Sequence, residues 1–244
     1  MKSSSILLAS LLGAFGLAAV QASASPRAAE ASGAHYLLAA EDLGGWHLGG
    51  FYRYADREVN DSESESLKQN KFAMHLGHDI LPWISVYGYL GSVTAKIETW
   101  GGDNDPAIEY GGGLWANLLD HDLLGNLAIE TRLRLQALAQ VSAASPEING
   151  TENDYVEFYG TLTLSIVNEL IGNKKYWPNA IGLFFGPVYN DISFDDEDSV
   201  NLTGATVGIT GGLDFYLTRF TTLSLGYEAY EDDKAFNAAL NFRF

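Results

Sequence analysis

The chain from Trp46 to Phe244 is built largely of runs in which apolar and polar residues alternate one by one. A period of two is typical of β-strands that have one apolar and one polar face, and no helical period is sustained in this part of the chain. We therefore expect an all-β fold. Ten runs carry the alternation: Trp46–Val59, Lys71–Ile80, Trp83–Glu98, Ala107–Leu119, Asn126–Ser142, Tyr155–Asn168, Ala180–Phe194, Val200–Tyr216, Thr221–Glu231 and Lys234–Phe244.

The connections between these runs are of two kinds that follow one another in turn. One kind is acidic and polar, as in "NDSESESLKQN" and "DDEDS", and the other is less acidic and edged with apolar or aromatic residues, as in "LPW" and "LTRF". Successive connections of an antiparallel meander lie at opposite ends of the sheet, which predicts two chemically different ends. This asymmetry is typical of an antiparallel up-and-down transmembrane β-barrel. We expect about ten strands. The number would be eight if two runs do not span the membrane: the run at Lys71, which is the shortest, and the run at Ala180, which contains Pro187.

The alternation also separates an apolar face from a charged face in most of the runs. In a transmembrane barrel the apolar face contacts lipid and the polar face lines the lumen. Charges inside a narrow lumen must be paired, because an isolated charge away from water is costly. We therefore predict an ionic network across the lumen. Its expected members are Arg53, Lys96, Glu109, Glu130, Arg132, Arg134, Glu157, Asp214, Glu228 and Arg243.

The N-terminal residues differ in character from the rest of the chain. Lys2 precedes an apolar run that ends in the small-residue stretch Ala22 to Ala24, and this pattern is typical of a secretory signal peptide. We interpret residues 1–24 as the signal peptide, residues 25–45 as a linker without a clear period, and residues 46–244 as the barrel. A membrane anchor is the alternative for the apolar run, but the run is short for a spanning helix.

The composition excludes several classes of protein. The chain has no cysteine, which excludes disulfides and thiolate metal sites, and its net charge of −17 argues against a nucleic-acid partner. Aromatic residues make up 12% of the chain, in keeping with a β-rich fold.

The last strand resembles the C-terminal assembly signal of bacterial outer-membrane β-barrel proteins. Asn237, Phe242 and Phe244 match the polar and aromatic positions of that signal, whereas Ala239 stands where the family usually has glycine. The final hairpins, "GLDFYLTRFTTLSLGYEAYEDDKAFNAALNFRF", are similar to those of the small OmpA/OmpX-like barrels. The resemblance implies residence in the outer membrane, insertion by the barrel assembly machinery and contact with lipopolysaccharide. It implies no particular chemistry, because one fold hosts many functions.

No strong catalytic or metal-binding motif accompanies this pattern. His75 and Asp79 share a strand face, but His78 falls on the other face and none of these residues has a clear route to the acidic end. We predict no catalytic site, no cofactor, no metal and a monomeric barrel with a structural or interaction role. The alternatives are a narrow pore for ions or small solutes, and an outer-membrane hydrolase acting on lipid or peptide. A soluble lipocalin-like barrel is a further alternative, suggested by "GGWHLGG", although such a barrel would have an apolar interior.

Overall fold

The structure is a computed structural model that describes residues 45–59, 62–81, 83–97, 105–123, 130–148, 151–169, 178–194, 204–218 and 220–244. The expected signal peptide, and the expected linker apart from Gly45, lie outside these residues. No helix among the described residues is both long and apolar enough to cross a membrane.

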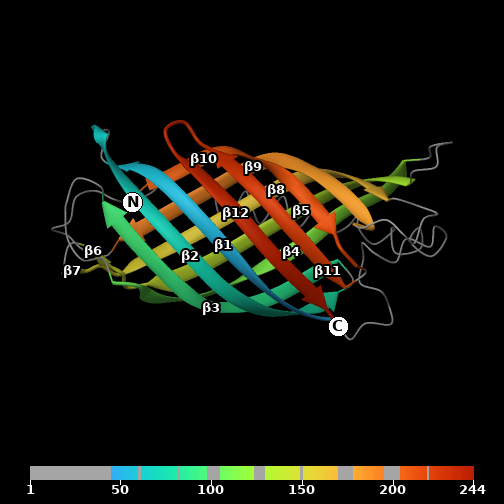
Figure 1. Ribbon diagram of the computed structural model, residues 1–244, viewed down its shortest axis with the longest axis horizontal. Coiled ribbons are helices and arrows are strands. Elements are labelled where there is room, and N and C mark those ends of the chain that lie inside the picture. The colour runs from blue at the N-terminus through green and yellow to red at the C-terminus, as the bar shows by residue number, and fades with distance from the viewer. Residues whose placement is uncertain are drawn as a thin grey trace, which may run out of the picture.

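Ten antiparallel strands close into a single barrel (Figure 1). Each strand pairs with the strand that precedes or follows it around the wall, and β12 returns to β1, so that the order is β1-β12-β11-β10-β9-β8-β5-β4-β3-β2. The prediction of an antiparallel up-and-down barrel is therefore confirmed, with ten strands rather than eight. The barrel strands are β1 Trp46–Val59, β2 Ser62–Leu81, β3 Ile84–Ile97, β4 Ala107–Leu123, β5 Glu130–Ala144, β8 Tyr155–Glu169, β9 Ala180–Phe194, β10 Gly204–Tyr216, β11 Thr221–Ala229 and β12 Lys234–Arg243.

The last residue of the chain completes the closure. The backbone N–H of Phe244 donates to the carbonyl of Trp46 at 2.9 Å, and the N–H of Trp46 donates to the carbonyl of Phe244 at 3.2 Å. Both chain ends of the barrel therefore lie at one end, which we call the terminal end. The acidic connections all join strands at the opposite end, which we call the looped end (Figure 1). The predicted chemical difference between the two ends follows directly from this topology.

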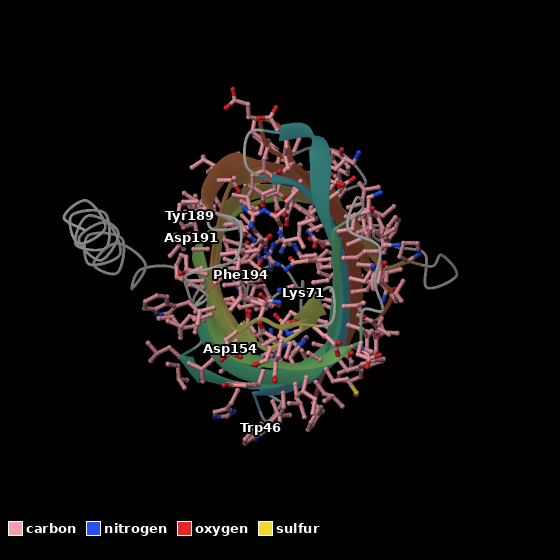
Figure 2. All side chains as sticks on the ribbon, turned by 90° about the vertical axis from the view of Figure 1, so that its left-hand side faces the viewer. Trp46, Lys71, Asp154, Tyr189, Asp191 and Phe194 are labelled. Atoms are coloured by element: carbon pink, nitrogen blue, oxygen red, sulfur yellow. The ribbon has the colours of Figure 1, made fainter. Side chains whose placement is uncertain are left out.

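The wall of the barrel is apolar outside and polar inside. On β2 the outward residues Phe72, Met74 and Leu76 are 59%, 55% and 50% exposed, while Lys71, which precedes them on the opposite face, is only 4% exposed. Figure 2, seen along the barrel from the looped end, shows Lys71 inside the wall and Trp46 outside it. A water-soluble barrel has the reverse arrangement, because its apolar side chains fill the interior. An apolar outer surface around a closed barrel is what a membrane requires, since a closed barrel leaves no unpaired strand edge in lipid.

Glycines on the lumen face allow aromatic rings to lie flat against the wall. A Cβ atom placed on Gly113 would lie 2.5 Å from the hydroxyl oxygen of Tyr87, and one on Gly212 would lie 2.5 Å from Cζ of Phe184. In both cases the ring belongs to the residue directly opposite on the neighbouring strand. The rings therefore occupy the notches that the glycines leave, and the space nearer the barrel axis stays available for other side chains.

Some strand boundaries differ from those expected. Strand β2 begins at Ser62 rather than near Lys71, because the β1–β2 pairing continues through the polar residues beyond the apolar band, where alternation no longer marks a strand. Pro187 does not cause a bulge in β9. The β8–β9 pairing skips the positions beside Gly186 and Pro187 and resumes in the same register at Phe185, since proline has no N–H to donate.

A short hairpin lies in a segment that the sequence had suggested was an irregular acidic connection. Strands β6 (Glu147–Ile148) and β7 (Thr151–Glu152) pair with each other between β5 and β8, outside the barrel sheet. The intervening residues are Asn149 and Gly150, a dipeptide that favours a two-residue hairpin turn. This signal was present in the sequence and predicts the hairpin.

Candidate functional site in the barrel lumen

A belt of buried charged side chains crosses the lumen from wall to wall. Arg53 of β1 donates from Nη1 to Oε1 of Glu157 on β8 at 2.8 Å, and from Nη2 to Oε2 of Glu228 on β11 at 3.0 Å. Strand β8 is five places from β1 in either direction around the ten-strand order, so β1 and β8 are opposite walls. The Arg53–Glu157 pair therefore spans the diameter of the barrel.

Lys71 of β2 forms the second cationic centre of this belt. Its Nζ lies 2.8 Å from Oε1 of Glu109 on β4 and also forms an ion pair with Oε2 of Glu157. The same ammonium lies 5.2 Å from the centre of the Tyr155 ring, within the range of a cation–π contact. Glu157 is thus shared between two cations that reach it from adjacent strands β1 and β2.

Neutral groups complete the coordination of the belt carboxylates. Glu228 accepts hydrogen bonds from the hydroxyl groups of Tyr159 at 2.6 Å and Tyr230 at 2.7 Å, and from the side-chain amide of Asn237 at 2.6 Å. Glu157 accepts a further bond from Nδ2 of Asn190 at 2.5 Å. Buried ion pairs are tolerated when such additional hydrogen bonds satisfy the remaining polar atoms. Glu157 and Glu228 meet that condition, whereas Oε2 of the third belt carboxylate, Glu109, has no hydrogen-bond partner among the described residues.

The lumen is filled further towards the looped end. Arg57 pairs with Asp233 at 3.2 Å and donates to Asn190 and Thr206, each at 3.1 Å. An apolar cluster lies in the same part of the barrel, formed by Val93, Ala144, Tyr155 and Ile192 with Ala107 and Phe194 packed against it. The interior near the looped end therefore combines ion pairs with apolar packing.

Further ion pairs lie towards the terminal end. Arg134 donates to Oδ2 of Asp120 at 3.0 Å, and Nη1 of Arg132 lies 3.9 Å from Oδ1 of the same carboxylate. Arg243 of β12 forms an ion pair with Asp79 of β2 across the intervening strand β1, and Asp79 also accepts a hydrogen bond from Ser85. The last contact ties together the strands on both sides of β1.

Nine of the ten predicted ionic-network residues fall into four groups. Arg53, Glu109, Glu157 and Glu228 lie in the belt, and Arg132, Arg134 and Arg243 lie in the ion pairs towards the terminal end. Asp214 faces the lumen and accepts a hydrogen bond from Ser224 at 2.6 Å. The side chain of Glu130 lies outside the described part of the structure.

Lys96 does not belong to the lumen, and its assignment to the network was wrong. The lumen face of β3 near the looped end carries Val93 and Ala95, both fully buried, so Lys96 is on the outer face and exposed. Near the looped end the usual pattern of apolar residues outside and polar residues inside is reversed. The lumen there holds the apolar cluster, and the outer face of β3 at this height lies beyond the apolar outer surface of the barrel.

Several members of the network were not singled out from the sequence. Asp120 lies beyond the run that was expected to end at Leu119, but β4 continues to Leu123 and brings the carboxylate of Asp120 to Arg134. Asn190 and Tyr159 reach the belt from β9 and β8. Their position on the lumen face could be read from the alternation, whereas their partners across the barrel could not.

The histidines at the terminal end form packing contacts. The rings of His47 and His75 lie 5.7 Å apart, and each occupies the notch beside a glycine on the neighbouring strand, Gly77 and Gly49 respectively. The ring of His78 lies 4.6 Å from that of Trp46. Within the described ranges, no three His, Cys, Asp or Glu side chains are arranged to hold a metal ion.

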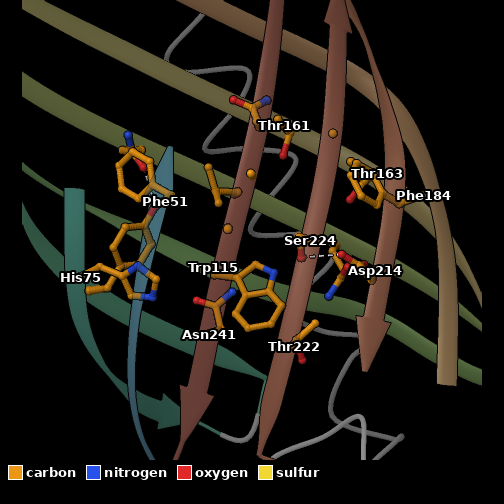
Figure 3. A pocket seen from close by; sticks show the side chains of 18 of the residues that line it. Phe51, His75, Trp115, Thr161, Thr163, Phe184, Asp214, Thr222, Ser224 and Asn241 are labelled. Carbon is orange, nitrogen blue, oxygen red and sulfur yellow. Dashed lines mark hydrogen bonds between the residues drawn. The ribbon is translucent and has the colours of Figure 1, made fainter. Parts of the chain in front are cut away.

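A cavity of about 360 Å³ lies between the belt and the terminal end (Figure 3). The belt residues Arg53, Lys71 and Glu157 form one boundary of this cavity, and Phe220 and Arg243 lie at the other. Its sides are formed by a mixture of aromatic, hydroxyl and amide side chains: Phe51, Tyr87, Trp115, Gln136, Gln140, Thr161, Thr163, Phe184, Thr222, Ser224 and Asn241.

Together, the closed sheet, the apolar exterior and the charged interior define this chain as a membrane β-barrel. No family model matches the chain, and no curated protein matches its sequence.

The chain shows a low structural likeness to several solved structures. The beta domain of the Bordetella autotransporter BrkA shows 12% identity, covers 83% of this chain and 100% of that chain, and gives a TM-score of 0.47. The transport unit of the Escherichia coli autotransporter AIDA-I shows 14% identity, with 84% and 91% covered and a TM-score of 0.43. The COG4313 outer membrane channel from Pseudomonas putida shows 11% identity, with 83% and 96% covered and a TM-score of 0.40. Likeness at this level carries no argument about function.

Proposed function

We propose that this protein is an outer-membrane β-barrel whose lumen is closed and whose acidic connections face the outside of the cell. Its role is structural or interactive: the barrel holds the looped end at the membrane surface and does not pass solutes. The observation that carries the proposal is the ion pair between Arg53 and Glu157, which come from opposite walls of the barrel.

The burial of the belt supports a closed lumen. A side chain that lines a water-filled channel is accessible to water from within the channel. In the belt, Glu228, Glu109, Glu157, Lys71 and Arg53 are only 0%, 1%, 3%, 4% and 8% exposed. The cavity on the terminal side reaches this belt and is bounded by it. The arrangement therefore favours a barrier over the alternative of a continuous narrow pore.

The orientation of the barrel is part of the proposal. An even number of strands places both chain ends on the same side, which in bacterial outer-membrane barrels is the periplasmic side. The acidic looped end then faces outward, where lipopolysaccharide and its divalent cations are the expected neighbours. The predicted signal peptide provides export, and Asn237, Phe242 and Phe244 are the proposed recognition residues for the barrel assembly machinery.

Planar-bilayer recording tests the closed lumen. Purified protein inserted into a lipid bilayer is expected to give no steady single-channel current, because the belt leaves no continuous water path. An open porin inserted under the same conditions serves as the positive control, and fluorescence of labelled protein in the bilayer confirms that insertion has taken place. A stable, reproducible conductance from the inserted protein would contradict the proposal and establish the pore alternative.

A further inference from the structure

The cavity on the terminal side of the belt has the composition of a ligand site. We propose that it binds a small uncharged molecule that combines a flat ring with hydroxyl or carbonyl groups. Its volume of about 360 Å³ lies within the range of sites for small molecules. Phe220 and Arg243 form the boundary of the cavity that is nearest the terminal end.

Aromatic rings provide the apolar walls of the cavity. Phe51 of β1, Trp115 of β4 and Phe184 of β9 face it from three different parts of the barrel (Figure 3). Two of these rings are fixed by their surroundings: Phe51 packs edge-on against Tyr89 with ring centres 5.3 Å apart, and Phe184 occupies the notch at Gly212. Rigid rings around an open space suit a flat ring in a ligand, because little side-chain freedom is lost on binding.

Free hydroxyl groups provide the polar contacts. Thr161 and Thr163 of β8 and Thr222 of β11 line the cavity (Figure 3). Among the described residues, these three hydroxyls have no side-chain hydrogen-bond partner, whereas other polar groups of the lining do. Gln140, for example, bonds to Tyr87 and Tyr89, each at 2.9 Å. The threonines can therefore donate to or accept from a ligand without breaking an existing bond.

The charges of the lining favour an uncharged occupant. Arg134 is paired with Asp120, Arg243 is paired with Asp79, and the belt residues are paired with one another. A charged ligand would lose its own hydration without gaining an unpaired partner of opposite sign. Asp214 also lines the cavity, and its carboxylate accepts a hydrogen bond from the neutral hydroxyl of Ser224. Because this carboxylate could attract a cation, a cationic ligand is the alternative that the experiment includes.

Trp115 is a reporter that the molecule itself supplies. In a variant with Trp46, Trp83, Trp100 and Trp177 replaced by phenylalanine, the remaining tryptophan lines the cavity. The probe is the neutral p-nitrophenyl β-D-glucoside, which carries a flat ring and hydroxyl groups and quenches tryptophan fluorescence. The charged probes are p-nitrophenyl phosphate and p-nitrobenzylamine. We expect saturable quenching by the neutral probe, with affinity at least about tenfold higher than for either charged probe, a difference of about 1.4 kcal/mol.

Matched variants separate binding in the cavity from partition into detergent or lipid. Ala239 lines the cavity, and Ala239→Leu is expected to fill it and weaken the affinity for the neutral probe about tenfold or more, the equivalent of about 1.4 kcal/mol. Ala139→Leu is the control, since Ala139 lies on the outward face of β5 between the cavity-lining residues Leu138 and Gln140. It adds the same side chain outside the cavity and should leave the affinity unchanged. Thr161→Val with Thr163→Val removes two hydroxyls at nearly constant volume and should also weaken binding of the neutral probe. This variant provides the test if Ala239→Leu does not fold.

The outcomes are distinct for each hypothesis. Quenching that does not saturate, or that is equal in the Ala139→Leu and cavity variants, would show that the cavity binds nothing and would overturn the proposal. Tighter binding of p-nitrobenzylamine than of the glucoside would assign the site to cations through Asp214 and would also overturn it. Since the measurement is made on the folded protein in detergent, its result does not depend on whether the barrel conducts ions.

Discussion

Replacing Glu157 with glutamine is expected to lower the free energy of unfolding of the barrel by about 3–5 kcal/mol, because it removes the carboxylate that two buried cations share. Glu157 receives Arg53 and Asn190 at Oε1 and Lys71 at Oε2. Glutamine has nearly the same shape, but its amide group directs N–H donors at one of the two cations and removes the negative charge that both share. The loss is therefore electrostatic rather than steric.

Unfolding of the reconstituted protein in urea, followed by tryptophan fluorescence, measures this effect. Glu152→Gln is the matched control, since Glu152 lies on the exposed β7 hairpin, and it should change stability by no more than about 0.5 kcal/mol. Adding Lys71→Met and Glu109→Gln to Glu157→Gln removes the second cation together with its remaining carboxylate partner, and should recover part of the loss. Equal stability of Glu157→Gln and the parent protein would show that the belt carries no such charge coupling.

Loss of the last residue should impair assembly of the barrel strongly. Deleting Phe244 removes both backbone hydrogen bonds between this residue and Trp46, and it removes an outward ring that is 56% exposed to the surroundings of the barrel. Phe244→Asp keeps the backbone but places a carboxylate on the apolar surface, where charge is unfavourable. We expect the amount of folded protein in the outer membrane to fall about tenfold in both variants, equivalent to about 1.4 kcal/mol or more in the assembly equilibrium.

Mobility on unheated detergent gels distinguishes folded from unfolded barrel in membrane fractions. Removal of residues 147–152 at the looped end is the matched control, because β6 and β7 within this range lie outside the barrel sheet. This control should assemble to nearly the level of the parent. If shortening the hairpin and deleting Phe244 reduced assembly equally, the closing role of Phe244 and its proposed recognition by the assembly machinery would both be refuted.

The sequence predicts the barrel well because the alternation of apolar and polar residues follows directly from the two faces of each strand, one outside the barrel and one in the lumen. Along β12, Phe236, Leu240 and Phe242 face outward and Asn237 and Asn241 face inward, as the pattern indicated. The rule fails where the environments change. Lys96 lies beyond the apolar band, and the lumen beside it is apolar, so the pattern there points to the wrong face.

The partners inside the lumen could not be predicted from the sequence. The stagger between strands decides which residues of opposite walls lie at the same height, and alternation contains no information about stagger. Arg53 and Glu157 are separated by 104 positions in the chain and meet only because of that stagger. The cavity was missed for a related reason: its lining comes from eight or more segments, and no short motif marks it.

The outward and inward faces of β12 offer the most direct test of the account. The chain has no cysteine, so a single cysteine introduced at each chosen position can carry a nitroxide spin label without competing native thiols. Labels at Leu240 and Phe242, in protein reconstituted into lipid, are expected to collide readily with oxygen, which concentrates in the membrane, and little with a water-soluble nickel complex. Labels at Asn237 and Asn241 should show low collision with oxygen. Nickel contact at Leu240 and Phe242 that exceeds oxygen contact would place this face in water and contradict a transmembrane barrel.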